Sequence, residues 1–193
     1  MKYAKRWSII YGKEKYWARG QEQEQHPDRL LLRKIVKLPV IDVGCGTGLD
    51  VKFYEDYVGI DVTPEFIKSA RRKYNDARLV LCDARYLPFR DKVFKTAFSK
   101  GVVIHYPQED GEKMLHDMIR ISNITYIAWG IPIIGPGRGE NYLPSYTSKF
   151  FVSNAGFHVN RYDLKELEKN FKIYPLEEGT SVTLIREKEE HEV

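Results

Sequence analysis

The fold is decided by one stretch of the chain, which runs Val40-Ile41-Asp42-Val43-Gly44-Cys45-Gly46-Thr47-Gly48. Its first residues have the apolar, β-branched character of a buried strand and include an acid. The alternating glycines that follow allow the chain to turn sharply out of the strand, because glycine adopts backbone angles that other residues avoid. A ligand can approach such a turn closely, and we expect free backbone N–H groups beside it. The stretch therefore predicts a nucleotide-cofactor loop.

Two further acids end later apolar runs. Asp61 closes the run that begins at Tyr57, and Asp83 closes the run that begins at Leu79. In a parallel sheet covered by helices, ligands bind outside the carboxyl ends of the strands, at the point where strand order reverses. We therefore expect Asp42, Asp61 and Asp83 to share one cleft. The distance of Asp61 from the glycines suits an acid that binds ribose hydroxyls.

Short β-branched runs alternate with longer polar segments, which is typical of βαβ units and a largely parallel sheet. The glycines and prolines beyond Gly130 predict a long connection, of a kind that is commonly functional. We expect helices over 27–37, 64–74, 107–122 and 163–170, and strands over 40–43, 57–61, 79–83, 124–129, 171–176 and 180–186. We also expect a helical flap over 3–19 and a β-hairpin of 149–153 with 157–161, for which a short helix ending at Gly156 is the alternative.

The composition fits one globular α/β domain over residues 1–193, with 42% hydrophobic and 30% charged residues. Two cysteines give neither a disulfide framework nor a metal-ligand cluster, so we expect no metal. The N-terminus is charged from Lys2 onward and lacks an apolar signal core, and the apolar run from Ile127 to Ile134 is too short to span a bilayer. We therefore expect a cytoplasmic protein with no membrane partner.

The choice of cofactor depends on the residue after the last glycine. A nicotinamide or flavin fingerprint, G-x-G-x-x-G/A, would place a small residue where this chain has Leu49. The observed G-x-G-x-G, with Asp42 before it, resembles the S-adenosylmethionine (SAM) site of class I methyltransferases. Leu87-Pro88-Phe89 and the run from Phe94 to His105 resemble that family's stretch from the third strand through the fourth. The resemblance covers about 40 to 106. It implies a three-layer αβα sandwich with a mostly parallel seven-stranded sheet and an antiparallel C-terminal strand.

The resemblance also implies the roles of the cofactor-binding residues. The glycine loop would hold the methionine end of SAM, Asp42 would orient its ammonium, and Asp61 would accept from the ribose. Asp83 would accept from the adenine amine, although a helix cap is the alternative for this residue. The complete set is Asp42, Gly44, Cys45, Gly46, Gly48, Asp61, Val62 and Ala84 at the adenine, Asp83, and Ser99 and Lys100 beneath the methionine portion.

His105 and Tyr106 are the candidate catalytic residues, because they lie just beyond the predicted fourth strand. An imidazole titrates near neutral pH and could serve as a general base. Methyl transfer from a sulfonium chiefly needs alignment and desolvation, so a packing role is the alternative for both residues. We interpret Cys45 as structural and not as a nucleophile, because a thiol among the loop glycines has little room for an acceptor.

The sequence thus predicts a SAM-dependent methyltransferase that moves the methyl group to an acceptor by in-line displacement and leaves S-adenosylhomocysteine (SAH). The acceptor stays open between a small molecule, RNA and protein, because a net charge of +4 does not choose among them. A non-catalytic SAM-binding subunit is the alternative.

Two segments outside the SAM motifs, 1–26 and 130–162, carry aromatic and basic side chains. We expect them to control the acceptor and not the cofactor. The aromatic start of the chain could equally stack bases, cover the cofactor or simply pack on the domain.

Overall fold

The computed structural model describes residues 5, 7, 8, 27–128, 150–152, 158–160, 172–175 and 182–187. Its α-helices are α3 (Pro27–Ile35), α4 (Pro64–Lys73) and α5 (Gln108–Ile121), and its 3-10 helices are η1 (Val51–Phe53) and η2 (Val103–His105). The strands are β1 (Val40–Val43), β2 (Tyr57–Asp61), β3 (Arg78–Leu81), β4 (Phe94–Lys100), β5 (Ser122–Ala128), β6 (Phe150–Val152), β7 (His158–Asn160), β8 (Lys172–Pro175) and β9 (Val182–Glu187).

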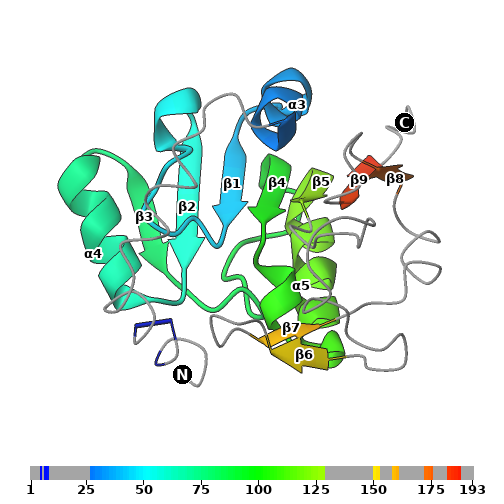
Figure 1. Ribbon diagram of the computed structural model, residues 1–193. Coiled ribbons are helices and arrows are strands. Elements are labelled where there is room, and N and C mark those ends of the chain that lie inside the picture. Colours follow the sequence, from blue (N-terminus) through cyan, green and yellow to red (C-terminus); the bar gives the residue numbers. More distant parts are fainter. Residues whose placement is uncertain are drawn as a thin grey trace.

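The main sheet has the strand order β3-β2-β1-β4-β5-β9-β8 (Figure 1). The first five of these strands are parallel, whereas β9 pairs antiparallel with β5 and β8 antiparallel with β9. The chain proceeds from β1 outward to β3 and then returns to β4 on the other side of β1. The order therefore reverses between β1 and β4, which is where ligands bind in open α/β sheets. The predicted α/β fold with a parallel sheet is confirmed.

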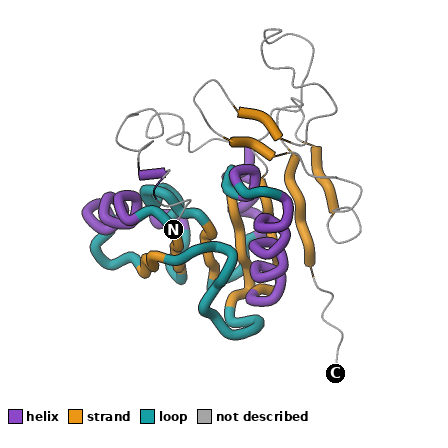
Figure 2. The backbone as a smooth tube through the Cα atoms, turned by 90° about the horizontal axis from the view of Figure 1, so that it is seen from below, coloured by secondary structure: helices purple, strands orange, loops and turns teal. Residues whose placement is uncertain are grey.

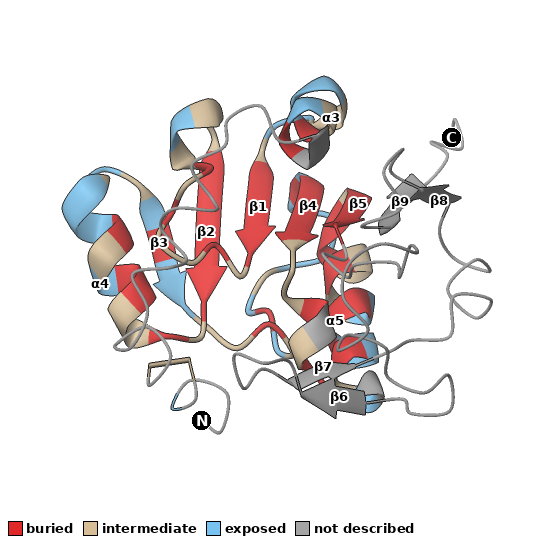
Figure 3. Cartoon of the chain, in the orientation of Figure 1, coloured by how far each residue is buried: buried red, intermediate tan, exposed pale blue. Residues whose placement is uncertain are grey.

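Helices cover both faces of this sheet (Figure 2). On one face, Met114 and Met118 of α5 belong to the same hydrophobic cluster as Ile41 of β1. On the other face, Leu32 of α3 and Ala70 of α4 cluster with the other side of β1 and β2. Strand β1 is buried along its whole length, as expected for a central parallel strand with helices on both sides (Figure 3).

Several element boundaries differ from those predicted. Helix α3 ends at Ile35 and not at 37, and Leu38, which follows, is disfavoured in helical conformation because it precedes Pro39. Strand β3 ends at Leu81, before Asp83, and β5 begins directly after α5 at Ser122. The antiparallel pair expected over 149–161 is present as β6 and β7, and β7 lies against η2.

Several predictions fall outside the described residues. These are most of the flap over 3–19, the connection beyond Gly130, and the helix over 163–170. Within the described part of the chain, no helix combines the length and apolar character needed to cross a membrane.

Candidate functional site

A pocket lies at the carboxyl ends of β1, β2 and β4, at the point where strand order reverses. Figure 2 looks onto this end of the sheet. Of the predicted site residues, the pocket is lined by Gly44, Gly46, Asp61, Val62, Ala84, Lys100, His105 and Tyr106. Its lining also includes Trp7, Thr47, Ile60, Phe66, Cys82, Gly101 and Val102. The predicted residues that do not line it are Asp42, Cys45, Gly48, Asp83 and Ser99.

Two glycines of the loop have separate steric reasons to lack a side chain. Gly44 has a φ of +85°, and a Cβ atom there would stand 2.2 Å from Cγ2 of Val102. Gly46 has a φ of +53°, and a Cβ atom there would meet no protein atom within 4 Å. Because Gly46 lines the pocket, that open space is part of the pocket. The missing side chain at Gly44 thus allows close packing against Val102, and the missing side chain at Gly46 keeps the pocket open.

Four backbone N–H groups of the loop are bound within the protein. Those of Gly44 and Cys45 both donate to the carbonyl of Ile60 at 2.8 Å, and that of Gly48 donates to the carbonyl of Cys45 at 2.9 Å. The Gly46 N–H donates to Oδ2 of Asp61 at 3.0 Å. The expectation of free N–H groups is therefore wrong at these four positions. A loop whose donors are engaged in this way is not a phosphate cradle of the kind that binds dinucleotides.

Asp61 combines burial with a place on the pocket wall. Its carboxylate accepts the N–H groups of Gly46 and, at 2.8 Å, Thr63, and the residue is only 8% exposed. Burial raises the pKa of Asp61, and the two backbone hydrogen bonds oppose that rise. A carboxylate offers about four acceptor positions, so capacity remains for hydroxyl donors in the pocket. This is the chemistry that a vicinal diol such as ribose requires.

Asp42 lies behind the loop and bonds to a tyrosine. The Tyr57 hydroxyl donates to Oδ2 of Asp42 at 2.8 Å, and Asp42 is 2% exposed. Burial holds the pKa of the Tyr57 phenol well above its usual value, so the hydroxyl keeps its proton and acts as donor. A Cβ atom at Gly59 would stand 2.9 Å from Cε1 of Tyr57. Gly59 therefore makes room for the ring that reaches Asp42.

Burial raises the pKa of Asp42 from 3.8 to about 7, while Lys100 opposes the rise. Between these values the folded state binds more protons than the unfolded state, so Asp42 lowers the free energy of unfolding as pH increases from about 4 to about 7. In cofactor-free protein, Asp42→Asn should therefore become progressively more stable than the wild type across this window, by up to about 1.4 kcal/mol per pH unit. Denaturant unfolding at about pH 5 and pH 7 measures the difference. A difference independent of pH would contradict the raised pKa.

Lys100 belongs to a buried charge cluster that the sequence motifs did not reveal. Its ammonium pairs with one oxygen of Asp50, and Nε of Arg29 lies 3.2 Å from the other. Asp50 is 4% exposed and Arg29 8%. Two cations thus share one carboxylate beside the pocket. Ser99, the neighbour of Lys100, donates its hydroxyl to the carbonyl of Val43 at 2.7 Å and ties β4 to β1 beneath the loop.

Asp83 is engaged by a neighbouring arginine. Nε and Nη2 of Arg85 donate to its two oxygens at 3.0 and 2.7 Å, and the Arg85 N–H donates to Oδ1 at 3.1 Å. Burial raises the pKa of Asp83, but the bonds from Arg85 outweigh it and hold the pKa below its usual value. Nη1 of Arg85 also lies 3.2 Å from Asp110 of α5. Arg85 thereby connects Asp83, in the turn after β3, with Asp110 of α5. The role of Asp83 toward adenine stays a prediction.

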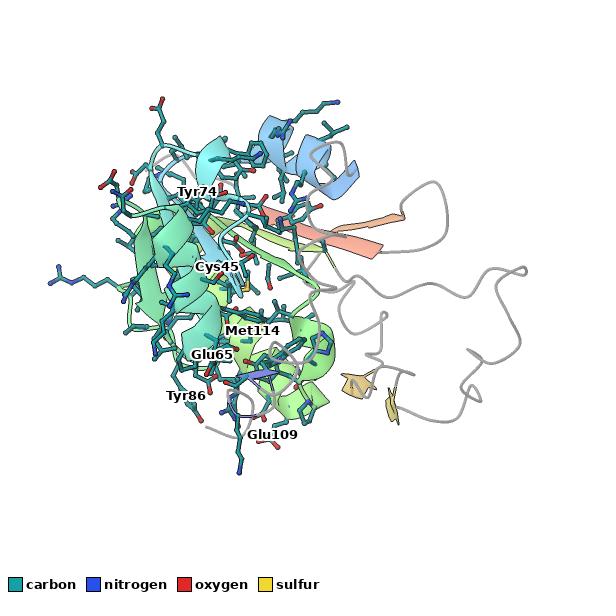
Figure 4. All side chains as sticks on the ribbon, turned by 60° about the vertical axis from the view of Figure 1, so that its left-hand side comes forward. Cys45, Glu65, Tyr74, Tyr86, Glu109 and Met114 are labelled. Carbon is teal, nitrogen blue, oxygen red and sulfur yellow. The ribbon has the colours of Figure 1, made fainter. Side chains whose placement is uncertain are left out.

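The loop cysteine faces the interior. Cys45 is 7% exposed and belongs to the hydrophobic cluster on the α3 and α4 side of the sheet (labelled in Figure 4). Burial raises the pKa of its thiol well above the usual value, which disfavours the reactive thiolate. The structural interpretation of Cys45 fits this environment.

The two candidate catalytic residues line the pocket from the segment after β4. His105 ends η2, and its ring centroid lies 4.8 Å from that of Trp7 in an edge-to-face arrangement. Tyr106 is 4% exposed. Their catalytic roles stay predictions. Trp7 was not singled out from the sequence, because its contact with His105 joins residues that are far apart in the chain.

Comparison with known proteins points to one class. Residues 40–123 match the family described as "Methyltransferase domain". Probable tRNA methyltransferase 9B of Homo sapiens is 32% identical over 112 residues, which are 55% of this chain and 22% of that protein. The chain spans about a quarter of the length of the curated relatives it matches first.

Two solved structures share the fold over most of the chain. The PH0226 protein from Pyrococcus horikoshii OT3 has a TM-score of 0.65 at 19% identity, covering 91% of this chain and 92% of that one. The 1,6-didemethyltoxoflavin-N1-methyltransferase of Burkholderia thailandensis, solved with SAH, has a TM-score of 0.64 at 18% identity, covering 94% of this chain and 84% of that one. The resemblance predicted from the motifs is confirmed: the chain has the class I, Rossmann-like fold of SAM-dependent methyltransferases, and residues 40–123 match the methyltransferase-domain family.

Proposed function

We propose that this protein is an enzyme that binds SAM in the pocket at the switch point and transfers its methyl group to an acceptor by in-line displacement, leaving SAH. The observation that carries the proposal is the hydrogen bonding of the glycine loop. Four N–H donors of this loop are engaged within the protein, and the pocket wall beside the loop carries the carboxylate of Asp61, which suits a nucleoside cofactor without phosphate. The methyltransferase domain match over 40–123 supports the same conclusion.

From the ends of β3 and β2 to those of β1 and β4, the residues that line the pocket would suit the adenine, the ribose and the methionine portion of SAM in turn. Asp61 would accept from the ribose hydroxyls, and the apolar surfaces of Val62 and Ala84 suit the adenine. Gly44 and Lys100 line the pocket at the ends of β1 and β4, on the side left for the methionine portion. The cation cluster of Lys100 and Arg29 around Asp50 would favour a carboxylate there.

When bound, the cofactor supplies an activated methyl group, and the protein's task is to align an acceptor and exclude water. His105 lines the pocket and could receive a proton from a protonated acceptor atom. If the acceptor carries a lone pair and no proton on the reacting atom, His105 and Tyr106 would line the pocket and take no part in proton transfer.

Strand β7 lies against η2, which carries His105 at the pocket. Among the described residues of the segment 130–162, the β6–β7 pair would therefore be near an acceptor bound there. Transfer RNA is the first acceptor to test, because the curated relative quoted above is named as a probable tRNA methyltransferase. Small molecules come next, because a neighbour of the same fold methylates one.

The decisive experiment is transfer of a radiolabelled methyl group from SAM into fractionated RNA, protein and small molecules of the host. We expect label in one fraction, and none with Gly46→Val. Saturable SAM binding with no label in any fraction, including unfractionated extract, would favour the alternative of a non-catalytic SAM-binding subunit. Tight binding of a reduced nicotinamide in place of SAM would contradict the cofactor assignment.

A further inference from the structure

One side chain of the N-terminal segment lies in the same pocket as the glycine loop. Residues 5, 7 and 8 are helical and lie at the carboxyl end of the sheet (Figure 1). Trp7 lines the pocket together with Gly46 and Asp61, and it packs on the hydrophobic cluster that α5 shares with β1. The aromatic start of the chain thus reaches the cofactor pocket itself.

The indole of Trp7 contacts aromatic residues on two sides of that pocket. Phe66, from the first turn of α4, follows β2 and the ribose-side acid, and its ring centroid lies 6.3 Å from that of Trp7. His105, from η2, follows β4, and its centroid lies 4.8 Å from Trp7. These two residues stand on opposite sides of the switch point between β1 and β4. Trp7 therefore spans the pocket from the β2 side to the β4 side.

Ser8, the residue after Trp7, stabilises this arrangement through a hydrogen bond. The Ser8 hydroxyl donates to Oε2 of Glu65 at 2.5 Å, on the first turn of α4. That hydrogen bond lowers the pKa of Glu65, so the acceptor is an ionised carboxylate near neutral pH. Glu65 is labelled in Figure 4. The bond holds the helical piece that carries Trp7 beside Phe66.

We propose that Trp7 is a cofactor-contacting residue whose indole closes the SAM pocket, and that the Ser8–Glu65 bond holds it closed. The inference rests on the proposed function and deepens it. A tryptophan side chain covers a large apolar area, so its removal exposes the bound nucleoside to water. Cofactor exchange then requires Trp7 and Ser8 to move away from α4. The N-terminal segment serves the cofactor as well as any acceptor, contrary to the division of roles expected from the sequence.

The test measures how fast labelled SAH leaves the wild type, Trp7→Ala, Trp7→Phe and Ser8→Ala. Excess unlabelled SAH is added to the complex, and the loss of bound label gives the release rate. We expect release about 10-fold or more faster for Trp7→Ala, a largely restored rate for Trp7→Phe, and a smaller acceleration for Ser8→Ala. Tyr86→Ala is the matched control, because Tyr86 is 64% exposed and does not line the pocket. Its release rate should equal that of the wild type.

Tryptophan emission gives a second readout. Binding of SAH should change the emission of the wild type, and most of that change should be lost in Trp7→Phe, which retains Trp17 and Trp129. Wild-type release rates in Trp7→Ala, or a full emission change in Trp7→Phe, would overturn the inference and leave the proposed function intact. A wild type that binds neither SAM nor SAH would instead overturn the proposed function and this inference together.

Discussion

Gly46→Val should eliminate measurable SAM binding while the protein stays folded. The Cβ position at Gly46 opens onto the pocket, with no protein atom within 4 Å, so a valine side chain would occupy ligand space. The φ of +53° adds backbone strain for any residue with a Cβ. Together these effects should weaken binding by at least ~3 kcal/mol, or more than about 100-fold. Isothermal titration calorimetry with SAM and SAH measures the loss.

Gly48→Ala is the matched control for Gly46→Val. Gly48 also has a positive φ, of +75°, but its Cβ would meet Ala70 at 3.1 Å and Val51 at 3.2 Å inside the domain. This substitution should lower the melting temperature and leave the SAM affinity of the folded protein nearly unchanged. If Gly48→Ala abolished binding and Gly46→Val did not, the assignment of the pocket to the cofactor would be wrong.

Asp61→Ala should weaken SAM binding by ~1–3 kcal/mol, about 5- to 150-fold. The substitution removes the acceptor proposed for the ribose hydroxyls. It also deprives the N–H groups of Gly46 and Thr63 of their partner, so the loop loses an internal tie. Calorimetric affinity together with thermal unfolding separates the two contributions, because the lost ties lower stability without ligand whereas the lost ribose contact does not.

Asp61→Asn refines the test. An asparagine fits the same space and keeps one acceptor oxygen, but its NH2 group would face one of the two backbone N–H donors. We expect an affinity between those of the wild type and Asp61→Ala. Unchanged SAM affinity in folded Asp61→Ala would remove this residue from the proposed site.

The central part of the fold could be predicted because local signals and the required topology agree there. The apolar run before Gly44 and the run that ends at Asp61 read as buried strands, and a parallel sheet brings their carboxyl ends together whatever the loops do. The helix from Pro64 was placed from a proline at the first helical position. Of the residues predicted on these segments, Gly44, Gly46, Asp61 and Val62 line the pocket.

The remaining features depend on contacts between distant residues. Asp50 is an ordinary loop acid in the sequence, and only folding places it between Arg29 and Lys100. Nothing local distinguishes Trp7 from the other aromatic residues at the start of the chain. The free N–H groups expected at the glycines were mispredicted because the carbonyl of Ile60 and the carboxylate of Asp61 already accept them.

The engaged donors of the glycine loop also bear on competition inside a cell. ATP and NAD share the adenosine half of SAM and are abundant, so a site that recognised adenosine alone would be filled by them. In the proposed site, a triphosphate or pyrophosphate would meet no spare N–H group at Gly44, Cys45, Gly46 or Gly48. We therefore expect the glycine loop to give a phosphate chain less support than the loop of a dinucleotide-binding protein does.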